Sequence, residues 1–415
     1  MSAPPLAGFL IARLPFFYGW VILGCVCCAS MARQGGAVAT LSVFISPMTA
    51  EFGWSRTAIS GAVSLGGVLA ALISPWLGPF LDRGGARLVL CMAILATGLS
   101  TMALSLTGSL SVFYLLFCTA RTNFAGPFDL GIHGAINNWF VARRALATSI
   151  ATLGHNSGLV LLPLVAAVAM EHGGWRGGWL AVGATVLAVG FIPVFLLMVR
   201  RPEDVGLVPD RAAVPGDIAR PSTAEPAFTR SEALRTRAFW LLALFTVLAY
   251  PVQAGVSLHQ APFLIERGLS PAIAAAAVSC FSLTAGLGTL CFGLVPRRVT
   301  MRARLAVVGV LLTIAMALLL RVASAPDAFL GTGMFGAGIG GLLVTLPITW
   351  ADYFGRRSYG AIRGIALSAQ VLAQATGPLL SGVLRDLTGG YEASLSCFAI
   401  LSALSIVAAL FARRP

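Results

Sequence analysis

The chain has 415 residues, of which 58% are hydrophobic and only 10% are charged, and its mean hydropathy is +0.88. Soluble domains usually carry about a quarter charged residues, so this composition excludes an ordinary soluble protein and indicates a membrane protein. The net charge of +13 does not indicate nucleic-acid binding, because the arginines lie in short loops between apolar runs and form no basic face.

Taken in chain order, apolar segments of membrane-spanning length recur twelve times, since a membrane helix needs about 20 mostly apolar residues. We predict these spans near residues 17–44, 57–80, 88–107, 110–135, 145–168, 177–199, 239–263, 271–294, 304–324, 327–351, 359–384 and 391–412. The first span is too long for a cleaved signal peptide, and no small-residue cleavage pattern follows it. The predicted fold class is an all-α membrane protein with twelve transmembrane helices.

The eight cysteines all fall inside these apolar segments, which argues against a disulfide framework. Cys25, Cys27 and Cys28 lie close together, but one helix lacks the second ligand pair that a tetrahedral metal site requires. Packing as small apolar side chains explains them better. We therefore expect neither a metal nor a cofactor.

One long polar stretch, residues 200–237, interrupts the series of spans. Its proline and charge content favours an extended linker, with a short surface helix at residues 230–237. The linker divides the chain into an N-terminal six-helix bundle, residues 1–199, and a C-terminal six-helix bundle, residues 238–415.

Two short motifs occur in both halves at nearly the same offset. GPFLDRGGAR (78–87) follows the second span, and GLVPRR (293–298) follows the eighth. WFVARRALATSI (139–150) links spans four and five, and YFGRRSYGAIRGI (353–365) links spans ten and eleven. These matches indicate an internal repeat of six helices, which is a common construction in transporters.

The arginines are distributed unevenly between the two sides of the predicted bundles. With a cytoplasmic N-terminus, 21 of the 28 basic residues, all of them arginine, fall on the inner side. The outer side holds Arg56, Arg176, Arg267, Arg321 and Arg385, and two arginines lie within spans. The positive-inside rule therefore predicts that both termini are cytoplasmic.

The motif GPFLDRGGAR resembles the signature loop of the major facilitator superfamily, with Gly78, Asp82, Arg83, Gly85 and Arg87 at the expected spacing. With the twelve spans and the repeat, this resemblance covers essentially the whole chain. It implies a cytoplasmic gate in which Gly78 lets two helices approach. There Asp82 lies near a helix N-terminus or pairs with an arginine. A solvated turn that only fixes the topology is the alternative.

A narrower resemblance is to the monocarboxylate transporter and oxalate:formate antiporter branches, especially their bacterial members. It rests on Tyr18-Gly19-Trp20, Trp139-Phe140, Arg143-Arg144, Gly154, Gly158, Pro163 and the segments 201–210, 229–240 and 351–365. The sequence departs from these branches in two places. Val38 and Ala39 stand where a lysine is expected late in the first span, and residues 271–294 contain no charged residue where span eight should carry an arginine.

Two arginines lie where the spans should cross the membrane core. Arg33 is about 16 residues into the first span, roughly 24 Å from its cytoplasmic end, and Arg121 has a similar depth in the fourth. The resemblance implies that spans one, four, seven and ten line the cavity, so both guanidinium groups could bind a carboxylate, sulfonate or phosphonate. The alternatives are snorkelling of Arg33 to the surface and proton coupling by Arg121, which the resemblance also implies.

Further polar residues are predicted to line the same pathway. The substrate-binding set adds Asn156, Tyr250, Gln253 and Gln374, with Gln253 near the kink expected at Pro251. Hydrogen bonds between helices are an equally good explanation for these side chains.

Four ionisable residues are candidates for a coupled proton. Asp129 and His133 are four residues apart and share one helical face, and His155 and His259 are lesser candidates. A partly desolvated carboxylate or a histidine can change its protonation state near neutral pH. A structural Asp–His pair, or a histidine bonded to a neighbouring helix, is the alternative.

These features predict a secondary transporter, not an enzyme. We expect it to move a small organic anion, monocarboxylate-like, across a bacterial inner membrane by alternating access, coupled to a proton. The expected partners are the anion, the proton and the lipid bilayer, with no nucleic acid, and the functional unit is expected to be a monomer. Proton-driven efflux of amphipathic compounds and a non-transporting membrane sensor on the same fold are the alternatives.

Overall fold

A computed structural model of the protein describes residues 4–210, 226–296 and 298–415. Residues 211–225 of the predicted linker and Arg297 of the second motif lie outside the described residues. Within those ranges every regular element is a helix, apart from an isolated bridge between Phe140 and Asp210.

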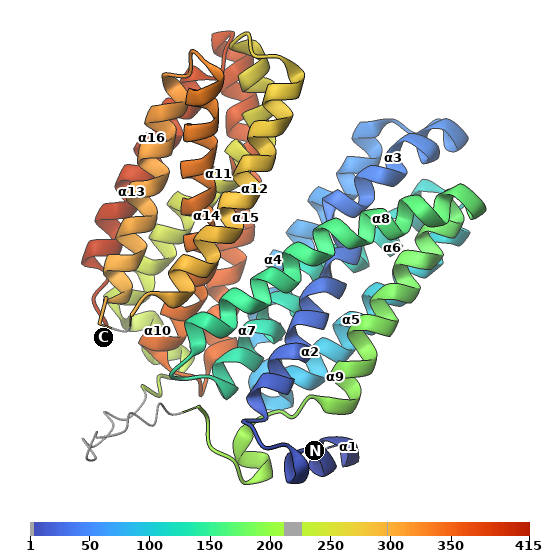
Figure 1. The fold of residues 1–415 in the computed structure, drawn as a ribbon, viewed down its shortest axis with the longest axis vertical. Coiled ribbons are helices and arrows are strands. Elements are labelled where there is room, and N and C mark those ends of the chain that lie inside the picture. The colour runs from blue at the N-terminus through green and yellow to red at the C-terminus, as the bar shows by residue number, and fades with distance from the viewer. Residues whose placement is uncertain (1–3, 211–225, 297) are drawn as a thin grey trace. The chain divides into compact units, whose positions relative to one another are not determined.

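Figure 1 labels the helices along the chain. The α-helices are α1 (Pro5–Arg13), α2 (Gly19–Ala32), α3 (Val38–Phe52), α4 (Arg56–Gly84), α5 (Ala86–Ala103), α6 (Leu110–Ala125), α7 (Pro127–Trp139), α8 (Arg144–Thr185), α9 (Ile192–Leu197), α10 (Arg230–Arg235), α11 (Arg237–Glu266), α12 (Pro271–Leu294), α13 (Met301–Leu320), α14 (Ala325–Phe354), α15 (Tyr359–Thr388) and α16 (Glu392–Phe411). Shorter turns of helix are η1 (Arg33–Gly36), η2 (Leu104–Leu106), η3 (Val186–Phe191) and η4 (Pro202–Val205).

All twelve predicted spans are helical. In the described part of the chain, nine helical segments are long and apolar enough to cross a membrane. One of them, Arg144–Leu197, contains two predicted spans, because Gly174 adopts a non-helical conformation (φ 58°, ψ −168°) inside α8. The other two predicted spans correspond to α6 with α7, which a break divides, and to the more polar α15. The all-α membrane fold class is confirmed.

The helices form two compact units. The first unit comprises Met1–Ala227 and Gly355–Ser368, and the second comprises Phe228–Phe354 and Ala369–Pro415. Helix α15 therefore begins in the first unit and ends in the second. The domain boundaries that we placed at the linker stay a prediction.

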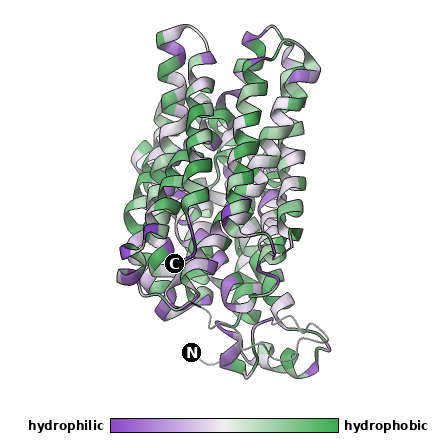
Figure 2. Cartoon of the chain, turned by 90° about the vertical axis from the view of Figure 1, so that its left-hand side faces the viewer, coloured by the Kyte–Doolittle hydropathy of each residue, from purple (hydrophilic) through white to green (hydrophobic). Residues whose placement is uncertain are grey.

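Apolar side chains occupy both the core and the outer faces of each unit. In the first unit, for example, Phe44 stacks on Trp179 with ring centroids 3.8 Å apart, while Trp76 is 73% exposed. In the second unit, Leu283 is 67% exposed. Figure 2 shows hydrophobic residues along the helices and hydrophilic ones gathered near the helix ends. This surface pattern suits contact with lipid, because a protein in water rarely exposes large apolar areas.

The first span is interrupted at mid-length. Helix α2 ends at Ala32, the chain continues through η1, and α3 starts after Ala37, whose backbone is extended (φ −79°, ψ 153°). Gly35 and Gly36 weaken a continuous α-helix here, since each costs about 1 kcal/mol relative to alanine. The interruption places Arg33 at the start of η1.

The fourth span is interrupted between α6 and α7. Gly126 is non-helical (φ −111°, ψ −86°) because the ring of Pro127 disfavours helical geometry in the residue before it. Pro127 itself fits the first position of a helix, where no N–H is needed. Asp129 consequently falls in the first turn of α7, where the helix dipole favours a carboxylate.

Candidate functional site

Arg33 and Phe124 make the first contact of the site, between η1 and α6. The Arg33 Nε donates a hydrogen bond to the carbonyl oxygen of Phe124 at 2.8 Å. Its guanidinium carbon lies 4.5 Å from the centre of the Phe124 ring, and its side chain is 17% exposed. Arg33 therefore points inward and is held on two sides, which disagrees with snorkelling to the surface.

Arg121 approaches the same ring. Its guanidinium carbon is also 4.5 Å from the centre of Phe124, and its Nε has no hydrogen-bond partner among the described residues. Gly66 of α4 makes room for the side chain, since a Cβ at that position would collide with the Arg121 stem. The two arginines singled out from the sequence thus meet on one aromatic ring, whose negative face attracts cations.

Asp129 is the acidic centre beside these arginines. Its Oδ2 lies 3.3 Å from the Arg363 Nη2, and its Oδ1 lies 3.9 Å from both the Arg33 Nη1 and the His133 Nε2. The Asp129 side chain is only 8% exposed. One buried carboxylate is therefore the shared ionic partner of two arginines and lies next to a histidine.

Arg363 belongs to this cluster, although it was not singled out from the sequence. It lies in the first turns of α15 with 1% of its side chain exposed. With Arg33 and Arg121 it brings three guanidinium groups to a region where Asp129 is the paired carboxylate. The sequence carries no signal for this burial, because an arginine near the start of a span normally belongs to a loop.

His155 of α8 joins the site through a second missed residue, Gln34. The Gln34 Nε2 lies 2.6 Å from the His155 Nδ1, and the Gln34 side chain is fully buried. The ring of His155 lies 6.4 Å from that of Phe124, centre to centre. Asn156 follows on α8 and is half-buried. The first unit thus gathers five predicted residues, namely Arg33, Arg121, Asp129, His133 and His155, around Phe124 and Gln34.

The remaining residues predicted for substrate binding and proton coupling lie in the second unit. The Gln374 Nε2 donates to the Gln253 Oε1 at 2.9 Å, which is the hydrogen bond between helices given above as the alternative. Tyr250 is buried one helical turn from Gln253. His259 contacts Tyr391 through its Nδ1, 3.2 Å from the tyrosine hydroxyl oxygen. Their role in binding or coupling stays a prediction.

Asp82, in the predicted gate motif, lies at the N-terminus of α15. Its two carboxylate oxygens accept hydrogen bonds from the backbone N–H groups of Gly360 and Ala361, each at 2.8 Å. Gly78 lies one turn earlier on α4, and a Cβ there would overlap the carbonyl of Gly360. Of the two expected roles for Asp82, the geometry corresponds to the helix N-terminus, and Gly78 permits the close helix approach.

Two further residues of the motif, Gly85 and Arg87, contact the end of the sixth span. Gly85 has a positive φ of 82°, and the Arg200 side chain packs against it. The Arg87 Nη2 donates to the carbonyl oxygen of Phe195 at 2.7 Å, while Arg83 is exposed. The motif therefore fixes the turn between α4 and α5 as well as the contact with α15.

The first residues of the predicted linker are ordered against the turn before α8. The Asp210 carboxylate accepts from the backbone N–H groups of residues 141, 142 and 143, and the Asp210 N–H donates to the carbonyl of Trp139 at 3.2 Å. Glu203 forms an ion pair of 2.6 Å with Arg356. Residues 200–210 thus contact other segments of the first unit.

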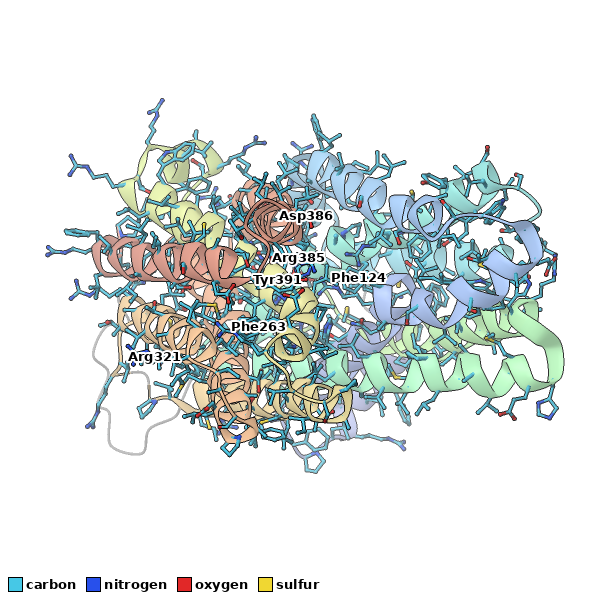
Figure 3. The ribbon with its side chains drawn as sticks, turned by 90° about the horizontal axis from the view of Figure 1, so that it is seen from above. Phe124, Phe263, Arg321, Arg385, Asp386 and Tyr391 are labelled. Atoms are coloured by element: carbon cyan, nitrogen blue, oxygen red, sulfur yellow. The ribbon has the colours of Figure 1, made fainter. Side chains whose placement is uncertain are left out.

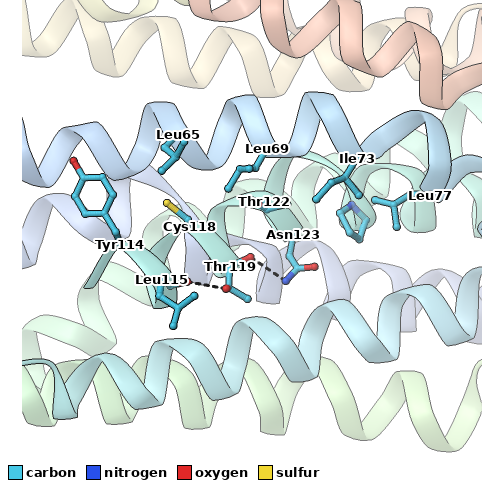
Figure 4. Close-up of a pocket in the computed structure, with 11 residues that line it drawn as sticks. Leu65, Leu69, Ile73, Leu77, Tyr114, Leu115, Cys118, Thr119, Thr122 and Asn123 are labelled. Atoms are coloured by element: carbon cyan, nitrogen blue, oxygen red, sulfur yellow. Dashed lines mark hydrogen bonds between the residues drawn. The ribbon is translucent and has the colours of Figure 1, made fainter. Parts of the chain in front are cut away.

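The first unit also has a groove of about 550 Å³ between α4 and α6 (Figure 4). Leu65, Leu69 and Ile73 form its α4 wall, while Thr119 and Asn123 of α6 bond to carbonyls of their own helix. No charged side chain lines it among the described residues. The groove therefore lacks the groups that would hold an anion.

Comparison with known sequences identifies the protein family. The sequence profile of the Major Facilitator Superfamily matches residues 22–320, which is well over half of the chain. The chain belongs to the major facilitator superfamily. This family consists of membrane transporters and not of enzymes, so the predictions of a multi-pass membrane protein and of a non-enzyme are confirmed.

Several curated members of the superfamily are similar over most of their length. The mouse monocarboxylate transporter 11 is 26% identical over 91% of this chain and 83% of its own. The oxalate:formate antiporter of Oxalobacter formigenes is 24% identical over 85% and 82% of the two chains. The membrane sensor protein UhpC of Salmonella typhimurium is 27% identical over 80% and 78%. The resemblance to the monocarboxylate and oxalate:formate branches is confirmed.

Solved structures of the superfamily share the fold. The proton:xylose symporter XylE, bound to a bromodeoxyglucose, has a TM-score of 0.75 at 14% identity and covers 94% of each chain. FucP in its outward conformation has a TM-score of 0.71 at 12% identity and covers 96% of this chain and 100% of its own. At such identities the similarity concerns the major facilitator fold alone.

Proposed function

We propose that this transporter moves a small organic anion, monocarboxylate-like, across a bacterial inner membrane by alternating access, together with a proton. The observation that carries the proposal is the gathering of three arginines in the first unit, where Arg121 stands beside the ring of Phe124. Arg33 and Arg363 contact the Asp129 carboxylate, whereas the Arg121 Nε has no hydrogen-bond partner among the described residues. A cation without a counter-ion is costly inside a membrane protein, so an anion at Arg121 would lower the free energy of the loaded transporter.

The two arginines on Phe124 are suited to contact the anion directly. Arg363 and one side of Arg33 are engaged with Asp129, whereas Arg121 contacts the ring and keeps its Nε without a protein partner in the described residues. A carboxylate would bind the guanidinium fork by paired, charge-assisted hydrogen bonds. The names of the monocarboxylate and oxalate:formate relatives support the same class of substrate.

The contacts of α15 suggest how binding could connect to alternating access. Asp82 holds the N-terminus of α15 through Gly360 and Ala361, and Asp129 holds the same helix through Arg363. An anion that competes with Asp129 for arginine would weaken the second contact. In our proposal this competition couples occupancy of the site to release of the cytoplasmic gate, whose motif runs from Gly78 to Arg87.

A thermal-shift screen of the purified transporter tests the substrate class. Formate, acetate, lactate, pyruvate and oxalate are compared with chloride at matched ionic strength, because a ligand that binds the folded state raises its apparent stability. We expect at least one carboxylate to stabilise the wild type and to lose this effect in R121Q. If chloride stabilises the protein as well as every carboxylate does, the cluster does not recognise carboxylates.

Uptake of the stabilising anion by proteoliposomes tests transport. Substituting Arg33→Gln or Arg121→Gln should lower uptake on the order of 10- to 100-fold, since a hydrogen bond to a charged group contributes about 1.5–3 kcal/mol. The matched control is R176Q, because Arg176 pairs with Glu51 at a surface position. Full uptake by both site variants would overturn the anion proposal.

A second candidate function is a membrane sensor that does not transport. The similarity to a protein named as a membrane sensor motivates it. Counterflow separates the two functions, since exchange of labelled for unlabelled anion across the membrane requires transport. Proton-driven efflux of amphipathic compounds, the other alternative, would show as drug resistance in a strain that lacks its own pumps.

A further inference from the structure

The second unit contains a polar pocket of about 460 Å³ beside the C-terminal end of α11. Its charged walls are two ion pairs, one between Arg385 and Glu266 at 2.8 Å and one between Arg267 and Glu392 at 3.3 Å. Tyr391 lies in the same wall, next to Arg385 (Figure 3). Both arginines belong to the set that the positive-inside rule assigns to the outer side.

A much smaller cavity of about 10 Å³ adjoins this pocket, and Tyr391 lines both. Its other polar lining comes from His259, Gln260, Ser381 and Ser394. Gln260 is 3% exposed, and its Oε1 accepts no hydrogen bond from the described part of the chain. A space of this size with several polar groups is at the lower limit for one water molecule. A water molecule there would satisfy Gln260.

The hydrogen bonds of His259 indicate which ring nitrogen carries the hydrogen when the histidine is neutral. The His259 Nε2 lies 3.3 Å from the carbonyl oxygen of Pro378, and its Nδ1 lies 3.2 Å from the Tyr391 hydroxyl oxygen. A carbonyl can only accept, so the Nε2 carries the hydrogen, and the Nδ1 then accepts from the Tyr391 hydroxyl. The Nδ1 of His259 thus accepts a hydrogen bond from Tyr391, the residue that lines both the small cavity and the polar pocket.

Charged groups of both signs lie in or beside the polar pocket that Tyr391 lines. They are Glu266 and Arg267 at the end of α11, Arg385 of α15 and Glu392 of α16, and Asp386 lies 3.6 Å from Arg385. Arg321 follows α13, two residues after Leu319 of the small cavity. The pocket therefore holds carboxylates as well as arginines, and the Tyr391 hydroxyl connects its wall to His259.

We propose that His259 and Tyr391 form the proton-binding site of the transporter, loaded from the polar pocket and separate from the anion site. Tyr391 passes its hydroxyl proton to the Nδ1 of His259 and takes a proton from hydronium in the pocket. Tyr391 is unchanged at the end, His259 is an imidazolium, and release reverses the transfer. The inference rests on the proposed function only in assigning this proton to transport.

Nitrogen NMR of the full-length protein, labelled on histidine and held in lipid nanodiscs, tests the site without any substrate. The chain has four histidines, so H259Q identifies the His259 signals. We expect the wild type to show the Nε2–H tautomer at high pH and the imidazolium at low pH. Y391F should redistribute the His259 tautomers and leave exposed His172 unchanged. A His259 signal that stays neutral wherever the protein is folded, or that Y391F does not alter, would overturn the proposal.

Transport of radiolabelled lactate in proteoliposomes tests the use of this proton. We expect H259Q and Y391F to lose accumulation driven by an imposed pH gradient and to retain lactate counterflow, which needs no net proton movement. H172Q is the matched control. Wild-type accumulation by H259Q, or an equal loss of counterflow, contradicts a proton-specific role. If the wild type itself shows no counterflow, lactate fails as the substrate, and the NMR titration alone decides the proton site.

Discussion

Charged side chains are arranged in two different ways in this transporter. At helix ends they pair in exposed positions, as Arg176 does with Glu51 at 2.7 Å, with side chains 47% and 39% exposed. Within the first unit, Asp129 is shared by Arg33 and Arg363 at 8% exposure. The exposed pairs are in contact with water, whereas the cluster in the first unit places two arginines beside a single buried carboxylate. Charged groups inside a membrane protein are costly and usually mark a functional pathway.

Removing the shared carboxylate should have the largest effect. D129N leaves two buried guanidinium groups without their counter-ion, and breaking a buried pair costs on the order of 3–5 kcal/mol. We expect a large fall in the melting temperature of the detergent-solubilised protein. The double variant D129N/R363Q should recover part of that loss, because one of the uncompensated charges is gone. Equal melting temperatures for the wild type and D129N would contradict the buried cluster.

Removing the ring between the two arginines should have a smaller effect. F124L deletes two cation–π contacts, each about 0.5–2 kcal/mol, and leaves the backbone carbonyl that Arg33 uses. We expect weaker anion binding in the thermal-shift assay and moderate destabilisation. The matched control is F9L, which removes the exposed cation–π contact between Phe9 and Arg13. If F124L and F9L changed anion binding and stability equally, the contacts of Phe124 with Arg33 and Arg121 would be no more important than an exposed cation–π contact.

Asp210 is intermediate between the buried cluster and the exposed pairs. Its carboxylate accepts hydrogen bonds from backbone N–H groups instead of pairing with an arginine. D210N keeps the shape but loses the charge, and its NH2 group replaces an oxygen that accepts from the backbone, so we expect a cost of about 1.5–3 kcal/mol. Chemical denaturation of wild type and D210N measures it. A loss as large as that of D129N would mean that the turn before α8 matters as much as the buried cluster.

The exposed pairs should have the smallest effect. E51Q removes the partner of Arg176 at the surface, where water and salt already screen the interaction. We expect no measurable change in melting temperature or in lactate uptake, at low or high salt. A clear loss in E51Q would show that this pair has a structural role that its exposure does not indicate.

Hydropathy alone was enough to predict the helices, because lipid-facing spans must be continuously apolar. It also isolated Arg33 and Arg121, since arginines in the middle of spans are rare and usually functional. Arg363 was not predicted as part of the site, because an arginine near the end of a span normally belongs to a loop. Nothing in the sequence shows that the start of α15 is buried. Phe124 and Gln34 resemble ordinary residues of a span. Only the tertiary structure shows that they contact arginine and histidine.

The sequence contains a signal for the break in the fourth span. The pair Gly126-Pro127 is a familiar chain-breaking signal, yet the predicted fourth span, residues 110–135, continues across it. On a straight helix Arg121 and Asp129 differ by about 12 Å along the axis. The break lets α6 and α7 turn independently, so that both residues contribute to one cluster with Arg33. The position of a charge along the sequence was therefore a poor guide to its neighbours.

Gly174 has a consequence for how the fifth and sixth spans are connected. A single non-helical residue joins two membrane-crossing helices inside α8, and its positive φ of 58° is open to glycine at little cost. Open space surrounds the position, so a side chain there would meet no neighbouring atom. Any substitution would nevertheless strain the backbone, and the reversal of the chain between the two spans therefore depends on one glycine.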